Sequence, residues 1–216
     1  MTGKAELIPA VLEQSRENLT TILQSLVGLV SRVQIDFADQ SLVANHTVLP
    51  ADLDRLSNDF ELDAHLMVNQ PMSYFTDLVR LGFKRVIVHV EAIDRPAAII
   101  VAAKAHQLDL AVTLKPETAI SALEPYRDAC QFIQVMAIDP GFGNQPFLAT
   151  TYERLDQIIM AFPHLPLAVD GGVRLDNARL LIEHGARLLV VGRAGFMADG
   201  DPTPGIDRWH ALLSSQ

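Results

Sequence analysis

The sequence predicts an α/β fold, a (β/α)8 barrel formed by a single domain over residues 1–216. Short runs rich in Val, Ile and Leu alternate with longer amphipathic segments along the whole chain, and the unit repeats about every 25 residues. No low-complexity linker divides the chain. Strict alternation of this kind favours a closed parallel barrel, and an open doubly wound sheet is the alternative that the pattern also permits.

Eight apolar runs are predicted to be buried parallel strands, because they lack the polar alternation of a half-exposed sheet. They cover residues 7–12, 32–37, 64–68, 85–90, 110–114, 132–137, 167–169 and 188–191. Between them, helices are predicted over residues 16–29, 71–81, 96–106, 118–126, 151–162, 176–184 and 206–213. The first has apolar residues at helical spacing. Gly82 and Gly185 stand where a helix end favours a left-handed residue.

Composition excludes several classes of function. The chain has 216 residues, a net charge of −9 and a 49% hydrophobic content. The acidic balance argues against a nucleic-acid or membrane partner. One cysteine, Cys130, cannot form an internal disulfide.

The segment before Leu7 lacks the apolar core of a secretion signal, and the chain has no apolar run long enough to span a bilayer, so we expect a cytoplasmic protein. The apolar run Ile99, Ile100 and Val101 on an outer helix would permit a homo-oligomer.

Polar side chains fall within or just after most of the predicted strands. In a barrel these positions meet at one face, so we expect a shared central site. The candidates are Gln34, Asp36, Asp39, His65, His89, Glu91, Lys115, Asp139, Asp170 and Arg193.

Three of these residues suit a divalent metal and acid–base chemistry. Asp36, His65 and Asp170 supply the oxygen and nitrogen ligands that zinc, iron(II) or manganese accepts. Two carboxylates can also remove a proton from one face of a carbon acid and return it to the other. Period-two spacing places Gln34 beside Asp36, and Asp63 on the same face as His65, where it could fix the tautomer of the ring.

Two glycine-containing loops complete the candidate site. The segment 139–145 (DPGFGNQ) follows the sixth strand and is long enough to act as a lid. The segment 169–173 (VDGGV) and the pair Gly192-Arg193 follow the last two strands, whose loops often bind phosphate in such barrels.

The order of these motifs resembles the ribulose-phosphate 3-epimerase family from about residue 8 to residue 196. The most specific pieces are residues 63–68 (DAHLMV), 88–92 (VHVEA), 136–145 and 169–173. The resemblance implies a TIM barrel of the ribulose-phosphate-binding type. It also implies a metal-dependent exchange of D-ribulose 5-phosphate and D-xylulose 5-phosphate by proton transfer at C3, with a small phosphorylated sugar as the partner.

The resemblance assigns roles to individual positions. It makes Asp36 and Asp170 the two acid–base residues and, together with His65, ligands of the metal, with Gln34 at a fourth ligand position. Residues that would contact the substrate or its phosphate are Met67, Met136, Gly141, Phe142, Gly143, Gly171, Gly172, Gly192 and Arg193. The Gly-Arg pair is similar to that of sibling phosphate-binding barrels, in which the guanidinium holds the phosphate.

Several positions depart from the family pattern. Gln34 stands where a histidine is usual, Ala10 where a serine is usual and Arg193 where a second serine is usual. Ala38 replaces a methionine, and Gln40 and Asn144 replace glycines. Three functions therefore remain open: the metal-dependent epimerase, a phosphosugar isomerase or lyase with an altered or absent metal, and a non-catalytic phosphosugar-binding paralogue.

Overall fold

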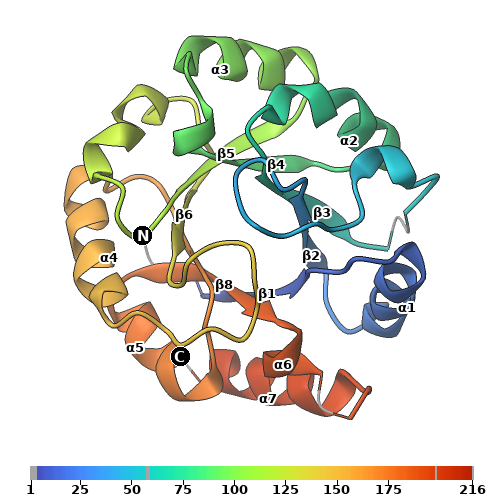
Figure 1. Cartoon of the computed structure of the whole chain (residues 1–216). Helices are drawn as coiled ribbons and strands as arrows, with labels where there is room; N and C mark the ends of the chain where they lie inside the picture. The colour runs from blue at the N-terminus through green and yellow to red at the C-terminus, as the bar shows by residue number, and fades with distance from the viewer. Residues whose placement is uncertain (1–3, 57–58, 198, 216) are drawn as a thin grey trace.

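The computed structural model describes residues 4–56, 59–197 and 199–215, and its strands close into a parallel barrel in the order β1 to β8 (Figure 1). The strands are β1 (Glu6–Val11), β2 (Arg32–Ala38), β3 (Glu61–Met67), β4 (Arg85–His89), β5 (Asp109–Leu114), β6 (Ile133–Met136), β7 (Leu167–Asp170) and β8 (Ala186–Gly192). Pairing of β1 with β8 closes the barrel, with Ala10 opposite Gly192. The predicted barrel is confirmed, and each predicted strand overlaps an observed one.

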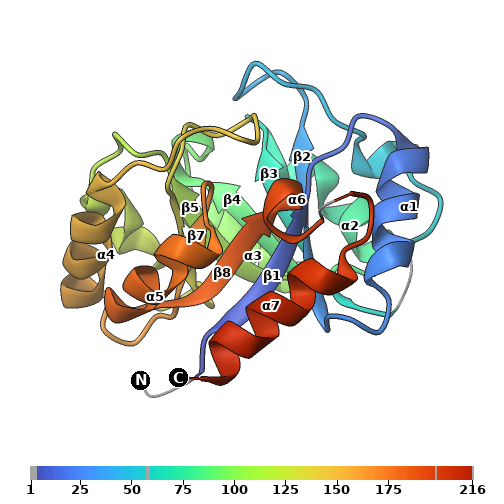
Figure 2. The same cartoon turned by 90° about the horizontal axis from the view of Figure 1, so that it is seen from below.

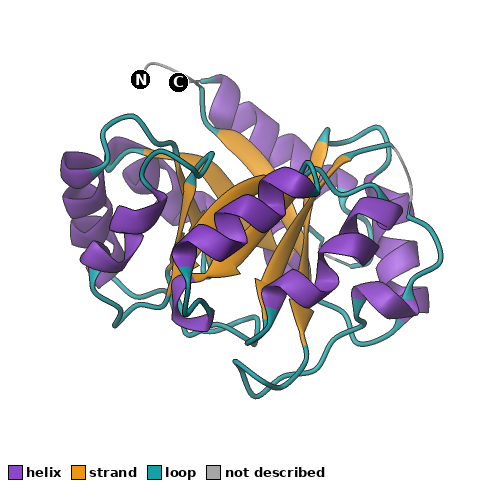
Figure 3. Ribbon diagram, turned by 90° about the horizontal axis from the view of Figure 1, so that it is seen from above, coloured by secondary structure: helices purple, strands orange, loops and turns teal. Residues whose placement is uncertain are grey.

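Helices surround the barrel on its outer side, as Figures 2 and 3 show from two further directions. They are α1 (Arg16–Leu26), α2 (Phe75–Leu81), α3 (Pro96–Ala105), α4 (Thr150–Ala161), α5 (Leu175–Glu183), α6 (Arg193–Phe196) and α7 (Thr203–Ser214). Short 3-10 helices are η1 (Pro50–Asp52), η2 (Pro71–Tyr74), η3 (Val90–Ala92) and η4 (Ile120–Tyr126). The apolar faces of the helices pack on the outer faces of the strands and form the larger hydrophobic core.

Local chemistry explains where the first helix begins and ends. The Ser15 side chain accepts a hydrogen bond from the backbone N–H of Asn18 at 3.1 Å, which caps α1. The helix ends at Leu26, shortly before Gly28 takes a φ of +78°, and this is earlier than the predicted end. Gly82 and Gly185 have φ values of +87° and +90°, as expected for residues that follow helices.

The barrel interior is divided into three layers because alternate strand residues point inward. At the amino-terminal end, Asp63 receives hydrogen bonds from Arg32 at 2.7 Å and from Arg85 at 3.0 Å. The interior of the barrel also holds an apolar cluster, of which Ala10 lines the cavity described below; its members are Ile8, Ala10, Ile87, Ala111, Phe132, Ala168, Leu188 and Val190. The carboxyl end carries buried polar residues, which include Gln34, His65, His89, Thr113, Gln134 and Asp170. This last layer is the floor of the candidate site.

Three expectations from the sequence are wrong in detail. Asp63 lies at the far end of the barrel and pairs with arginines, so it does not orient His65. The segment predicted as a helix over residues 118–126 is the 3-10 helix η4, because Pro125 lies inside it and cannot donate an α-helical hydrogen bond. Ile99 packs inward with 1% exposure, so it does not belong to an outer apolar face, although Val101 is 67% exposed.

Within the described residues, no helix combines the length and the apolar character that crossing a bilayer requires.

Candidate active site

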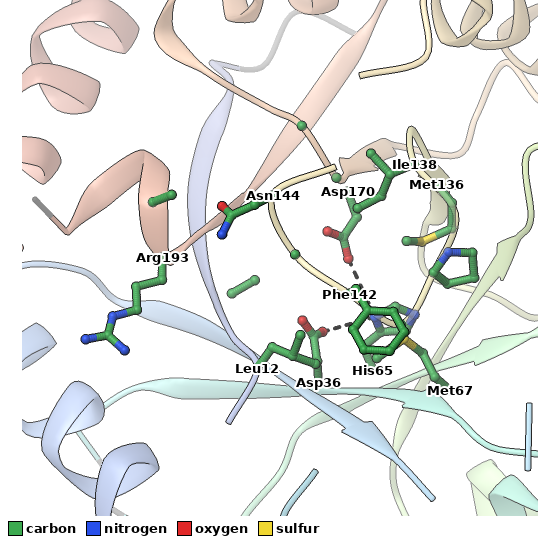
Figure 4. Close-up of a pocket in the computed structure, with 18 of the residues that line it drawn as sticks. Leu12, Asp36, His65, Met67, Met136, Ile138, Phe142, Asn144, Asp170 and Arg193 are labelled. Atoms are coloured by element: carbon green, nitrogen blue, oxygen red, sulfur yellow. Dashed lines mark hydrogen bonds and ion pairs between the residues drawn. The ribbon is translucent and has the colours of Figure 1, made fainter. Parts of the chain in front are cut away.

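Two carboxylates and a histidine converge at the carboxyl end of the barrel (Figure 4). Asp36 lies near the end of β2, His65 is in β3, and Asp170 is the last residue of β7. The His65 Nδ1 atom lies 3.0 Å from Asp36 Oδ1 and 3.5 Å from Asp170 Oδ2. Their side chains are almost buried, with 12% exposure for each aspartate and 1% for the histidine. Closure of the barrel therefore brings together three residues that are far apart in sequence.

The Gln34 side chain joins the two carboxylates. Its Nε2 donates to Asp36 Oδ1 and to Asp170 Oδ2, both at 2.8 Å, and lies 3.4 Å from His65 Nδ1. Gln134, on β6, donates a further hydrogen bond to Asp170 Oδ2 at 2.9 Å. The amide groups partly compensate the repulsion between two negative charges held in a buried space.

Burial and the charge of Asp36 raise the pKa of Asp170 well above its usual range, although His65 and the Gln34 hydrogen bond oppose the shift. Burial disfavours the charged form of His65, but the hydrogen bond and charge of Asp36, with the charge of Asp170, raise its pKa. One acidic group of the pair is thus set to hold a proton more tightly than an ordinary aspartate does.

On its other side, His65 contacts a second histidine. Its Nε2 lies 3.0 Å from the Nε2 of His89, the last residue of β4. The His89 Nδ1 lies 3.5 Å from Glu91 Oε2. Burial and the neighbouring His65 lower the pKa of His89 to about 4, although Glu91 opposes this. Burial would raise the pKa of Glu91, but the nearby His89 and hydrogen bonds from Thr118 and the Lys115 N–H lower it to about 2.

A cavity of about 500 Å³ opens above the carboxylates. Residues 140–144 of the loop after β6 line it. In Figure 1 this strand-to-helix segment crosses in front of the barrel centre. This loop rests on the loop after β2, since Asn45 Nδ2 donates to the Gly141 carbonyl at 2.6 Å. The Gln145 amide donates to the Asp139 and Phe142 carbonyls at 2.6 and 2.8 Å. The ring of Phe142 is 51% exposed at the cavity mouth.

The loops after β7 and β8 form the opposite wall. Gly171 and Gly172 have φ values of +102° and +62°, and a Cβ at Gly171 would lie 2.3 Å from Ile138 Cγ1. A Cβ at Gly192 would meet nothing within 4 Å, so its backbone borders open space. The Arg193 guanidinium is directed away from the carboxylates (Figure 4) and lies 3.2 Å from Glu13 Oε1.

The structure brings most of the predicted site residues to this one cavity. Those that line it are Asp36, His65, Met67, Met136, Gly141, Phe142, Gly143, Asp170, Gly171, Gly172, Gly192 and Arg193. Gln34 lies beneath them with 1% exposure. Other polar strand ends are directed elsewhere: Asp39 accepts hydrogen bonds from Ser41 and Tyr74, and Lys115 and Asp139 do not line the cavity.

Sequence reasoning missed two polar neighbours of the site. Gln134 holds Asp170, and its signal was present, because it is an amide inside an apolar strand and two residues from Met136. Glu13 lines the cavity beside Arg193 and follows β1 directly. No spacing rule pairs residues 13 and 193, since the closure of β1 against β8 brings them together.

The donor set fits a divalent cation. One ligand atom from each of Asp36, His65 and Asp170 can be chosen so that all lie within 4.8 Å of one another. Gln34 can offer its carbonyl oxygen to the same point by rotating its amide, because oxygen and nitrogen of an amide occupy similar space. Carboxylate, imidazole and amide oxygen form a mixed set suited to zinc, iron(II) or manganese.

The strands form a closed parallel barrel, and acidic and imidazole groups lie at their carboxyl ends. The protein is thus of the class of (β/α)8 barrels, which place their functional sites at this face. The family model "Ribulose-phosphate 3 epimerase family" matches residues 4–196, and the chain belongs to this family.

Individual relatives agree with this assignment. The chain is 28% identical to ribulose-phosphate 3-epimerase of Schizosaccharomyces pombe over 203 residues, which cover 90% of this chain and 88% of the relative. It is 31% identical to the Bacillus subtilis enzyme over 169 residues, with coverage of 75% and 78%. Among solved structures, KGPDC from Streptococcus mutans has a TM-score of 0.73 at 14% identity and 99% coverage of both chains. A 3-hexulose-6-phosphate synthase has a TM-score of 0.70 at 20% identity, covering 96% of this chain and 99% of that one. These two structural likenesses show the shared fold.

Proposed function

We propose that this protein epimerises a ketose phosphate at C3, with D-ribulose 5-phosphate and D-xylulose 5-phosphate as the favoured pair. The observation that carries the proposal is the placement of Asp36 and Asp170. Both carboxylates reach the cavity, and both accept hydrogen bonds from one Gln34 nitrogen at 2.8 Å, so they lie on two sides of a single point. Family membership supports the same reaction.

In this mechanism one carboxylate removes the C3 proton, and the electron pair of the broken C–H bond moves toward the C2 carbonyl to form an enediolate. The other carboxyl group then delivers its proton to the opposite face of C3, and the carbonyl re-forms. The raised pKa of Asp170 supports this exchange, because one member of the pair holds a proton while the other is ionised. After one turnover the two residues have exchanged protonation states.

The cation site would be held by Asp36, His65, Asp170 and the Gln34 carbonyl oxygen. A divalent cation bound there would draw electron density from the substrate oxygens and so acidify the C3–H bond. The backbone of Gly172 and Gly192 borders the far part of the cavity, where it would hold the phosphate group. Phe142 and its loop would exclude water above the reacting carbon.

Proton NMR in D2O tests the proposal. Metal-stripped protein and protein supplied with zinc, iron(II) or manganese are incubated with D-ribulose 5-phosphate. We expect loss of the C3 proton signal and growth of xylulose 5-phosphate in the metal-loaded sample. Asp36→Asn should reduce the rate by about 10²–10⁴-fold. Asp39→Asn is the matched control, because that carboxylate is bound by Ser41 and Tyr74 outside the cavity. Full activity of Asp36→Asn would overturn the mechanism.

The identity of Gln34 favours a second candidate, an isomerase or lyase acting on a phosphosugar without metal. An amide is a weaker ligand than imidazole for zinc or iron, and here its N–H groups already neutralise part of the carboxylate repulsion. Equal activity before and after exhaustive chelation would support this candidate. Strict dependence on added metal would exclude it.

A further inference from the structure

A line of three side chains runs from the candidate site toward the loop after β5. It consists of His65, His89 and Glu91. The two imidazole rings are inclined by 24° with centroids 5.1 Å apart, while their Nε2 atoms are 3.0 Å apart. The centroid separation exceeds the nitrogen separation by about two ring radii, so the rings meet edge to edge and share one hydrogen bond.

A hydrogen bond between two imidazole nitrogens needs a single hydrogen, which allows two arrangements. In the first, His65 Nε2–H donates to a bare His89 Nε2, and His89 carries its hydrogen on Nδ1. In the second, His89 Nε2–H donates to His65, and His89 Nδ1 is bare. The choice matters at the site, because neutral His65 faces the carboxylates with a bare Nδ1 in the first arrangement and with an N–H in the second.

The surroundings of Glu91 select between the two. Its Oε1 accepts hydrogen bonds from the Lys115 backbone N–H at 2.8 Å and from the Thr118 hydroxyl, which hold the carboxylate in place. Its Oε2 lies 3.5 Å from His89 Nδ1, a long contact but an electrostatically favourable one for an N–H. Among the described residues no hydrogen bond reaches His89 Nδ1, which leaves this electrostatic contact to act on it. An ionised carboxylate only accepts, so it favours hydrogen on this nitrogen.

We infer that Glu91 is a positioning residue that acts through His89 and leaves Nδ1 of His65, which faces Asp36 and Asp170, as the nitrogen that would bind a cation. With hydrogen on His89 Nδ1, His89 Nε2 must accept from His65 Nε2–H. His65 Nδ1 is then the nitrogen on the side of the carboxylates. Without a cation it donates its hydrogen to Asp36 Oδ1 at 3.0 Å, and a bound cation would replace that hydrogen. The inference concerns the same site as the proposed function, and its hydrogen arrangement exists with or without turnover.

Ring nitrogen NMR of 15N-labelled, metal-free protein tests the inference directly. In the wild type we expect His89 to show a protonated Nδ1 and a bare Nε2, and His65 to show a protonated Nε2. In Glu91→Gln the amide oxygen can keep its contacts with Lys115 and Thr118 and turn its NH2 toward His89. We therefore expect hydrogen to move from His89 Nδ1 to His89 Nε2 and to be lost from His65 Nε2. A wild-type His89 that is protonated on Nε2, or a folded Glu91→Gln variant with unchanged tautomers, would overturn the inference.

Zinc binding in the absence of substrate gives a second readout. Because loss of an orienting partner typically weakens a metal site by 10- to 100-fold, we expect Glu91→Gln to raise the zinc Kd by that factor. Glu91→Asp, which keeps the charge, should restore most of the affinity. Glu117→Gln is the matched control, because it removes an exposed charge from the same loop. An unchanged zinc Kd in Glu91→Gln would count against the inference. If the wild-type tautomers are as expected but ketose phosphates are not turned over, the proposed function fails and the inference stands.

Discussion

Replacing Gln34 by leucine tests how the two carboxylates coexist in the folded protein. The substitution roughly conserves volume but removes the N–H groups that donate to Asp36 and Asp170 at 2.8 Å. Gln34 is 1% exposed, so water cannot readily take the place of the amide. The effect is measured on metal-free protein at pH 8, where the carboxylates repel each other most strongly.

The magnitude follows from two opposing contributions. A hydrogen bond to a charged group contributes about 1.5–3 kcal/mol, so the loss of two costs about 3–6 kcal/mol. Burial of the leucine side chain stabilises the folded protein by about 2 kcal/mol, which offsets part of this loss. We therefore expect Gln34→Leu to lower the free energy of unfolding by about 1–4 kcal/mol at pH 8. The deficit should shrink as the pH falls, because Asp170 has a raised pKa and a neutral acceptor contributes less, about 0.5–1.5 kcal/mol per bond.

Urea denaturation in EDTA at pH 8 and pH 5 measures both values. Gln24→Leu is the matched control, since Gln24 is exposed on α1 and should change stability by less than about 0.5 kcal/mol. A Gln34→Leu protein as stable as the wild type at pH 8 would refute the view that this amide holds the carboxylates together. If the loss in unfolding free energy instead grows from pH 8 to pH 5, the assignment of negative charge to Asp36 and Asp170 at pH 8 is wrong.

Three further substitutions test other parts of the structure. Glu91 has a pKa lowered to about 2, so its stabilisation is present above the ordinary value of 4.5 and is lost as the pH falls toward 2. Because solvent screens this partly exposed group, Glu91→Gln should cost about 1–2 kcal/mol at pH 7, and urea titrations should show the deficit fading below pH 4.5. Gln40→Gly should raise the unfolding free energy by about 0.5–1 kcal/mol, since Gln40 has a φ of +68°; an unchanged urea midpoint would contradict this. Gly205→Ala should lower Tm by at least about 4 °C, because its Cβ would lie 2.0 Å from the Phe196 carbonyl oxygen, and an unaltered melting curve would exclude that clash.

The fold could be predicted from sequence because its signals are local. Nearly continuous Val, Ile and Leu runs mark strands covered on both faces, and β4 and β5 follow this pattern. The period of two then assigns Gln34 and Asp36 to one face of β2. Since the carboxyl ends of parallel strands meet at one face, the same pattern also predicted the cavity that holds Asp36, His65 and Asp170.

Pairings between distant residues could not be predicted in the same way. Spacing places Asp63 on the face of His65, but it does not show that Asp63 lies at the opposite end of the barrel beside Arg32 and Arg85. The Arg193 side chain was expected to face a phosphate, and in the structure its ion-pair partner is Glu13. Both outcomes depend on which strands become neighbours, and neither position carries a local signal of its partner.

Departures from the family pattern differ in their structural consequences. Gln40 and Asn144, where the family resemblance implies glycine, have left-handed backbone with φ values of +68° and +60°. The loop conformation is thus retained at a cost in strain, which is small for asparagine and larger for glutamine. Retention of an unfavourable conformation indicates that the contacts around these loops determine the backbone there.

The remaining departures lie on two adjacent strands of the barrel. Ala10 and the Gly192-Arg193 pair lie side by side, because β1 pairs with β8 in the register Ala10 to Gly192. The two carboxylates to which we assign the proton transfer, Asp36 and Asp170, come instead from β2 and β7. Relative to the pattern that the resemblance implies, a hydroxyl is missing and a cation is added on β1 and β8, which lie between the two strands that carry the carboxylates. The Arg193 guanidinium is directed away from Asp36 and Asp170 (Figure 4), so we expect differences from other family members in KM for ketose phosphates of different length more than in the rate of proton exchange at C3.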